Sequence, residues 1–152
     1  MAAVLGGIVD FLLAFTLLLG MVYWYGIRLH ATILWMPLFL LLAFVSSLAA
    51  GLWLSALNVE YRDIRHVIPF LVQMWMFATP IAYSSSLLRE PWHTLYAINP
   101  MVGVVEGFRW AILGSRTRPD VSLLVSSVIA VIALVTGAFF FRRTEKRFAD
   151  LI

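Results

Sequence analysis

Three stretches of this sequence are each as long and as apolar as a helix that crosses a lipid bilayer. They run from Ala2 to Tyr23, from Leu34 to Leu57 and from Val121 to Phe141. A membrane-spanning helix needs about 20 predominantly apolar residues. A fourth stretch, Val67 to Tyr83, is shorter and spans the bilayer if its ends lie in the interfacial region, with Pro69 suited to its first turn.

The composition leads to the same conclusion. Of the 152 residues, 62% are apolar and 12% are charged, whereas ordinary globular domains carry about 25% charged residues. A soluble chain of this size cannot cover its surface with so few polar groups. We therefore predict an all-α integral membrane protein with about four transmembrane helices, and with short external re-entrant or interfacial helices before the last span.

The stretch from Leu95 to Gly114 is apolar but contains Glu106 and Arg109. At mid-membrane each of these charges costs about 2.5 to 3.5 kcal/mol, whereas about seven large apolar residues contribute only about 3 kcal/mol together. The stretch therefore does not span the bilayer by itself. Because Glu106 and Arg109 are three residues apart, they share one helical face and can pair. We expect a short helix that dips into the membrane and is covered by protein.

Local signals mark the start of that re-entrant helix. Asn99 followed by Pro100 is typical of a helix N-cap and a first-turn proline. An interfacial segment around Trp92 to Tyr96 precedes them.

Basic residues predict the orientation. Four of them follow the last span within the sequence FRRTEKRF, and such clusters mark the cytoplasmic side. Four spans put both termini on that side, so the loop between the second and third spans is cytoplasmic and the region from Ser84 to Asp120 is external. The four basic residues are Arg142, Arg143, Lys146 and Arg147.

Small residues recur at four-residue spacing in two of the predicted spans. Such stripes let helix backbones approach closely in lipid, although small residues also occur by chance in apolar helices. The pairs in the second span are Ser46 with Ala50 and Ser47 with Gly51, and the series in the last span is Ser122, Ser126 and Ala130.

Motifs for several kinds of chemistry are missing from the sequence. No Walker-type glycine loop occurs, so nucleotide hydrolysis requires another chain. His30, His66 and His93 lack metal-ligand spacing, and there is no cysteine. The net charge of +3 is too small to indicate nucleic-acid binding. We therefore predict no catalytic residue, no cofactor and no metal site.

The sequence LNVEYRDIRHVIPF, residues 57–70, concentrates charge between two apolar stretches. It is interpreted either as a solvated hairpin turn or as a docking site for a partner. In the second interpretation Asp63 caps a helix that begins at Ile64, and arginine and aromatic side chains contact an acidic surface of the partner. The contact residues that we expect are Tyr61, Arg62, Asp63, Arg65 and His66.

Two longer segments resemble a known family. GLWLSALNVEYRDIRHVIPFLVQMWMFATPIAYSSSLL and LYAINPMVGVVEGFRWAILG are similar to the C-terminal part of ABC-2-type permeases, especially those that export lipid-linked polysaccharides such as O-antigen or teichoic acid. The resemblance covers most of Gly51 to Gly114. GGIVDFLLAF fits the family's third span, so residues 1–152 correspond to a partial permease domain with the third to sixth spans. The most specific elements are Asn58–Arg65, Pro69, Thr79–Tyr83, Asn99–Met101 and Glu106–Trp110.

The resemblance implies a multi-pass protein of the bacterial inner membrane with six spans per subunit. It also implies a homodimer, contact with membrane lipid, a lipid-linked glycan as substrate and a separate ABC ATPase subunit on the cytoplasmic side. The family's first two spans and main coupling helix have no counterpart here, so the chain is either a fragment or is completed by another polypeptide. The turn at residues 61–66 is then a secondary contact with the ATPase.

The same resemblance implies that short external helices, about Pro91 to Gly114, form a gate near the pore exit. The gate residues would include Asn99, Pro100, Glu106, Arg109 and Trp110. Aromatic rings stack on sugar faces without fixing register, and they also anchor helices at membrane interfaces. Candidates for a glycan path are Tyr83, Trp92, Tyr96 and Phe108.

Three alternatives remain open from the sequence. The first is an ABC-2 permease for a small drug or lipid, and the second is a truncated permease without function. The third is a membrane enzyme acting on lipid-linked sugars, with Glu106 or Asp63 as acid or base. The arginines beside both carboxylates favour structural pairing over that catalytic role.

Overall fold

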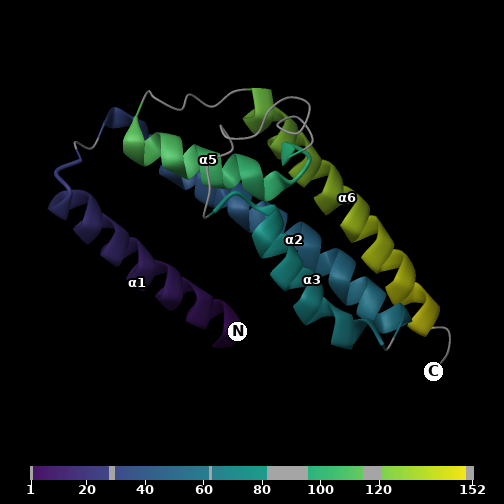
Figure 1. Cartoon of the computed structure of the whole chain (residues 1–152). Helices are drawn as coiled ribbons and strands as arrows, with labels where there is room; N and C mark the ends of the chain where they lie inside the picture. The colour runs from purple at the N-terminus through teal and green to yellow at the C-terminus, as the bar shows by residue number, and fades with distance from the viewer. Residues whose placement is uncertain (1, 28–29, 62, 82–95, 115–120, 150–152) are drawn as a thin grey trace.

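The computed structural model describes residues 2–27, 30–61, 63–81, 96–114 and 121–149, and within these ranges it contains helices and no strand (Figure 1). The helices, in chain order, are α1 (Ala2–Trp24), the 3-10 helix η1 (Ala31–Trp35), α2 (Met36–Glu60), α3 (Ile64–Ala78), α5 (Pro100–Leu113) and α6 (Val121–Ala149). Successive long helices alternate in direction, so the N-terminus, the α2–α3 turn and the C-terminus all point to one end of the bundle (Figure 1).

The centre of the fold is the pair α2 and α6, which pack along their length (Figure 1). Small residues make this close approach possible. The buried small residues of α2 are Ser46, Ala49 and Ala56, and those of α6 are Ala130, Gly137 and Thr144. Ser126 of α6 is buried against Gly103 of α5 instead. Several of these positions are seven residues apart, which keeps them on one face of each helix.

The predicted small-residue stripes are therefore confirmed only in part. Ser46, Ser126 and Ala130 are buried, as expected for residues at helix contacts, and Ser126 lies against Gly103 of α5. Ser47, Ala50 and Gly51 are exposed, because the contact face of α2 follows the seven-residue spacing from Ala49 to Ala56 instead. The side chain of Ser122 lies outside the described part of the chain.

Trp53 connects the C-terminal half of α2 to α6. The indole nitrogen of Trp53 on α2 donates a hydrogen bond of 3.1 Å to the carbonyl of Ala133 on α6. Its ring stacks on Phe140, with centroids 5.0 Å apart. A side chain at Gly137 would come within 2.9 Å of the indole, so the glycine makes room for it.

Helix α5 crosses the α2–α6 pair at one end of the bundle (Figure 1). Its glycines face the neighbouring helices: a Cβ at Gly103 would lie 2.6 Å from the Cβ of Ser126, and a Cβ at Gly107 would overlap the ring of Phe39. The helix ends at Gly114, whose φ of 81° is unfavourable for residues with a side chain. The hydroxyl of Thr32 in η1 donates a 3.0 Å hydrogen bond to the carbonyl of Ala111 in the last turn of α5.

By contrast, α1 and α3 lie at the outside of the bundle (Figure 1). No residue of α3 is buried, and in α1 Val22 is the buried one among the side chains described. Leu17 on α1 is 71% exposed and Phe77 on α3 is 67% exposed. So much exposed apolar surface is unfavourable in water but compatible with lipid.

Among the described residues, two helical stretches are long and apolar enough to cross a membrane, judged by length and composition: Ala31–Glu60 and Leu123–Glu145. The helices Val9–Trp24 and Ile64–Ala78 are apolar but shorter. Only 28% and 17% of the two longer windows are buried, which differs from the mostly buried core helix of a soluble protein. The predicted all-helical membrane fold agrees with these observations, and the count of four spans stays a prediction.

Candidate functional site

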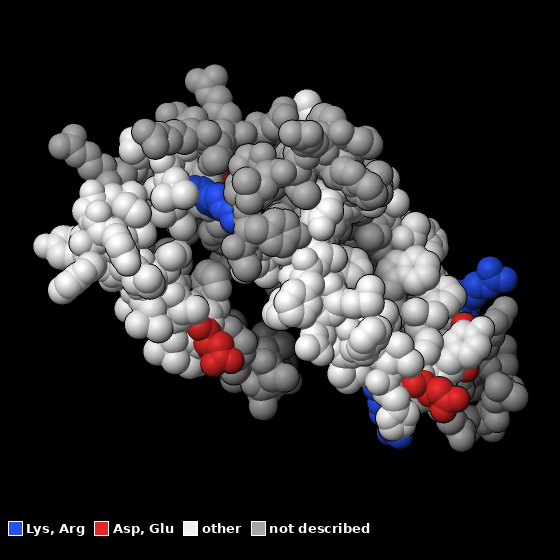
Figure 2. Space-filling view, viewed as in Figure 1, with Lys and Arg blue, Asp and Glu red and all other residues white. Residues whose placement is uncertain are grey.

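The two regions singled out by the sequence lie at opposite ends of α3. At one end is the turn between α2 and α3, and at the other end is the contact between α3 and α5 (Figure 1). Figure 2 shows that acidic and basic residues gather where α2, α3 and α6 meet at the turn end of the molecule.

The turn is short because backbone hydrogen bonds close it. The amide of Tyr61 donates to the carbonyl of Leu57 at 2.8 Å and ends α2, while the amide of Ile64 donates to the carbonyl of Tyr61 at 3.1 Å and starts α3. The predicted helix start at Ile64 is confirmed. Only residues 61–63 connect the two helices, so the turn follows any displacement of either one.

The prediction that the Asp63 side chain caps α3 is wrong, although the position of the residue was predicted correctly. Asp63 occupies the N-cap position, but its backbone is helical (φ −76°, ψ −20°) and its side chain makes no capping hydrogen bond. A capping side chain needs an extended backbone to reach the free amides of the first turn. The first turn is closed instead by its own backbone, with the amide of His66 donating to the carbonyl of Asp63 at 3.1 Å.

The side chains of this turn are directed to the surface. Tyr61 is 56% exposed, and Asp63, Arg65 and His66 are exposed as well. Arg62, the fifth predicted contact residue, lies outside the described residues. The exposed basic residues Arg142 and Arg143 on α6 lie toward the same end of the bundle, so a partner approaching this end meets the turn and the tail together.

Pro69 is not in the first turn of its helix, contrary to the prediction. Because α3 begins at Ile64, the proline lies inside the helix, where it cannot donate to the carbonyl of Arg65. Its neighbours His66 and Phe70 are exposed, so the accepting carbonyl is not sealed in a packed core.

At the other end of α3, the predicted start of α5 is confirmed. The backbone of Asn99 is extended (φ −78°, ψ 114°), its side-chain oxygen accepts a 3.0 Å hydrogen bond from the amide of Met101, and Pro100 occupies the first turn. The asparagine oxygen satisfies an amide that the helix itself cannot, and the proline lacks an amide that would need satisfying.

The same asparagine also binds the end of α3. Its side-chain nitrogen donates to the hydroxyl of Thr79 at 3.0 Å and reaches the carbonyl of Ala78 at 3.5 Å. The hydroxyl of Thr79 in turn donates to the carbonyl of Trp75 at 2.9 Å. Thr79 is 3% exposed, so its hydroxyl is shielded from solvent, where leaving a polar group unpaired is costly.

Two further side chains complete this contact. Arg109 on α5 donates from its guanidinium to the carbonyl of Pro80 at 3.2 Å. Ser126 on α6, which is fully buried, donates to the carbonyl of Ala97 at 3.0 Å and lies 3.4 Å from that of Asn99. We refer to Thr79, Pro80, Asn99, Arg109 and Ser126 together as the α3–α5 joint.

The predicted pairing of Glu106 with Arg109 stays a prediction. Both residues are half-buried on α5, and the contact from Arg109 to the Pro80 carbonyl is one that no sequence pattern indicated. In the sequence, Thr79 and Pro80 are distinctive only as part of the family resemblance. The pairing of Thr79 with Asn99, 20 positions later, has no local signal in the sequence.

The aromatic residues proposed for a glycan path divide into two groups. Phe108 packs against Phe39 of α2 with centroids 6.2 Å apart, and Trp110 meets the same ring edge-on at 6.4 Å. Both therefore help to seat α5 on α2. Tyr96 is half-buried, and Tyr83 and Trp92 lie outside the described residues.

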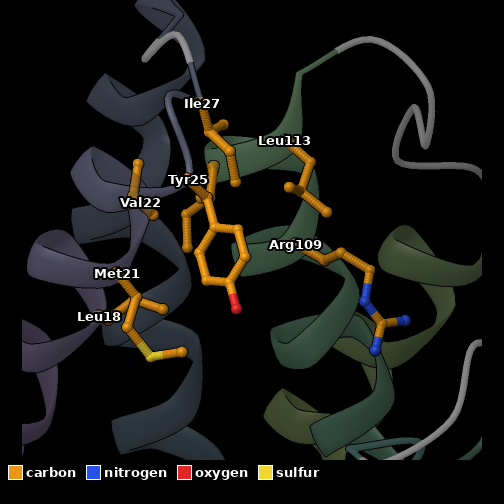
Figure 3. Close-up of a pocket in the computed structure, with 8 residues that line it drawn as sticks. Leu18, Met21, Val22, Tyr25, Ile27, Arg109 and Leu113 are labelled. Carbon is orange, nitrogen blue, oxygen red and sulfur yellow. The ribbon is translucent and has the colours of Figure 1, made fainter.

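An apolar pocket of about 330 Å³ lies between the end of α1 and α5 (Figure 3). In Figure 3 the guanidinium of Arg109 points away from α1, so the arginine borders the pocket with its aliphatic stem. The other lining residues are Leu18, Met21, Val22, Tyr25, Ile27, Ile112 and Leu113. Within the described part of the chain no group of three or more His, Asp or Glu residues is placed to hold a metal ion.

Comparison with known proteins identifies the family. The model of the family described as ABC-2 type transporter matches residues 1–113, so this chain belongs to the ABC-2 type transporter family. It is an integral membrane protein of a family of transport subunits.

Individual relatives narrow the comparison. The chain is 30% identical over 139 residues to the O-antigen export system permease protein RfbA of Myxococcus xanthus, covering 90% of this chain and 52% of the relative. It is 22% identical over 144 residues to a protein of the same name from Klebsiella pneumoniae, covering 93% of this chain and 55% of the relative. The chain therefore spans about half the length of these relatives.

Proposed function

We propose that this chain is part of the membrane subunit of an ABC exporter that moves a lipid-linked polysaccharide, of the O-antigen or teichoic-acid type, across the bacterial inner membrane. The observation that carries the proposal is its similarity, over nine-tenths of its length, to an O-antigen export permease. The homodimer, the cytoplasmic termini and the glycan substrate belong to this proposal.

In this proposal the turn at residues 61–66 contacts the ATPase subunit. Its exposed Tyr61, Arg65 and His66 support the role, since aromatic and arginine side chains are favoured at interfaces. The two-ended attachment to α2 and α3 makes the turn a stiff contact rather than a free loop. Asp63 supports it as well, because its carboxylate is not used for capping.

The external end of the subunit is formed by α5, which we propose as part of the gate. Its charged residues Glu106 and Arg109 are half-buried, and Arg109 donates to the carbonyl of Pro80, which lowers the cost of a charge near lipid. Asn99, Pro100 and Trp110 fix where the helix starts and how it is seated. Of the proposed path residues, Tyr96 precedes α5 and Phe108 lies on it, and both are half-buried.

The experiment is co-purification of the chain with its proposed ABC ATPase subunit, using Arg65→Glu and Tyr61→Ala variants. We expect each variant to weaken binding at least about fivefold, equivalent to about 1 kcal/mol. Tyr23→Ala is the matched control for Tyr61→Ala, because it removes an exposed tyrosine near the C-terminal end of α1, at the opposite end of the bundle. Binding that is unchanged in both turn variants would remove the proposed role of the turn.

The substrate class is tested separately by complementation. A strain lacking its O-antigen or teichoic-acid export permease is supplied with the complete permease that contains this chain, and surface polysaccharide is measured. Restored polymer supports the proposal. Resistance to a small drug or transport of a short-chain lipid, without surface polymer, would assign the subunit to a different class of ABC-2 exporter.

A further inference from the structure

We propose that Asn99 and Thr79 are positioning residues, and that the α3–α5 joint is the contact through which α3 sets the placement of the external helix α5. The proposal rests on the function proposed above, because it gives α5 a position that matters for transport. It concerns how the two helices are held together, which can be measured without the ATPase.

The first argument is the way in which α3 is attached. Along its fifteen residues none is buried, whereas Thr79 and Pro80 directly after it are 3% and less than 2% exposed. At its other end the three-residue turn joins it to α2. Because α3 is held at the turn and again at Thr79 and Pro80, it links the two sites, so a displacement at the turn reaches the joint.

The second argument is the chemistry of the joint. Thr79, Asn99 and Ser126 each use a side-chain group on another element, and the guanidinium of Arg109 reaches the backbone of Pro80. These hydrogen bonds link the end of α3 with α5 and α6, and Thr79, Pro80 and Ser126 are buried there, where an unpaired polar group is costly. Contacts of this kind specify one arrangement of two helices more narrowly than apolar packing does.

The third argument is that Asn99 has two separable roles. Its oxygen caps α5 by accepting from the amide of Met101, and its nitrogen donates to Thr79 on the other element. Asn99→Asp keeps a capping oxygen and loses the donor. A residue that only capped α5 would tolerate this change, because aspartate caps helices as well as asparagine does.

The chain has no native cysteine, so spin labels can be placed without background. One pair joins Met74→Cys on α3 to Leu113→Cys on α5, and a reference pair joins Leu48→Cys on α2 to Ile132→Cys on α6. All four positions are exposed. Distances are measured by pulsed electron paramagnetic resonance on the full chain in lipid nanodiscs.

The distances are compared between the parent chain and Asn99→Asp, Thr79→Val and Thr79→Ser. Thr136→Val is the matched control, because the hydroxyl of Thr136 donates within its own helix to the carbonyls of Ile132 and Ala133. We expect Asn99→Asp and Thr79→Val to raise the share of displaced α3–α5 distances about three- to tenfold, the range that interhelical hydrogen bonds in membranes support. Thr79→Ser and Thr136→Val should match the parent chain.

An unchanged α3–α5 distance in both Asn99→Asp and Thr79→Val would overturn the proposal. An equal change in the α2–α6 reference pair would also overturn it, because the variants would then loosen the whole bundle. Failure of the parent chain to bind the ATPase would count against the proposed function alone, since the label distances decide the joint by themselves.

Discussion

The two ends of α3 are built in opposite ways. At the turn, Tyr61, Asp63, Arg65 and His66 are exposed, and the helix starts without a side-chain cap. At the joint, Thr79 and Pro80 are buried, and Asn99 both caps α5 and binds α3. The chain thus fixes one end of α3 through its own side chains and leaves those of the other end on the surface, which agrees with the proposed contact between the turn and an ATPase subunit.

The largest loss of stability is expected from substitutions where α5 packs against α2 and α6, at the joint end of the molecule. Gly103→Ala places a Cβ 2.6 Å from that of Ser126, and Gly107→Ala places one against the buried ring of Phe39. We expect each change to lower the free energy of unfolding by about 1 to 3 kcal/mol, as other overpacked sites do. The measurement is the unfolding midpoint in detergent micelles.

Gly51→Ala on α2 is the matched control, because nothing lies within 4 Å of the position that its new Cβ would occupy. Removing a glycine from a helix interior should leave stability unchanged or raise it by up to about 1 kcal/mol. If the three alanine variants unfold alike, the close seating of α5 is not a determinant of this fold.

A second prediction compares the two helix starts directly. Asn99→Ala removes a capping bond and the contact with Thr79, so we expect a loss of about 1 to 2 kcal/mol. Asp63→Ala removes no capping bond, and the expected loss is under about 0.5 kcal/mol. Chemical unfolding of both variants under the same conditions measures the difference. A loss at Asp63 as large as that at Asn99 would break the comparison.

The smallest effect is expected from charge changes in the turn. Arg65→Gln and His66→Gln alter exposed side chains, so the free energy of unfolding should stay within about 0.5 kcal/mol of the parent value. The same variants should bind the ATPase subunit less tightly in the co-purification assay. Variants that unfold the chain while binding normally would show that the turn serves stability rather than docking.

Local signals in the sequence predicted where several helices of this fold begin. Asn99 with Pro100 predicted the start of α5, and Asp63 with Ile64 predicted the start of α3, because capping depends on residues that are neighbours in the chain. The capping bond of Asp63 failed as a prediction because the backbone angles of a three-residue turn are set by both helices. The small-residue stripe of α2 failed in part because only the partner helix selects which face is buried.

By itself the sequence determined that this is a helical membrane protein, where its apolar helices lie and which turn carries exposed charge. Those properties follow from composition and from contacts within about four residues. Only the tertiary structure decided that Thr79 meets Asn99, that Arg109 reaches Pro80 and that Ser126 closes the joint, because these partners are 20 to 29 positions apart. Hydrogen bonds over such separations form only after helix packing has brought the elements together.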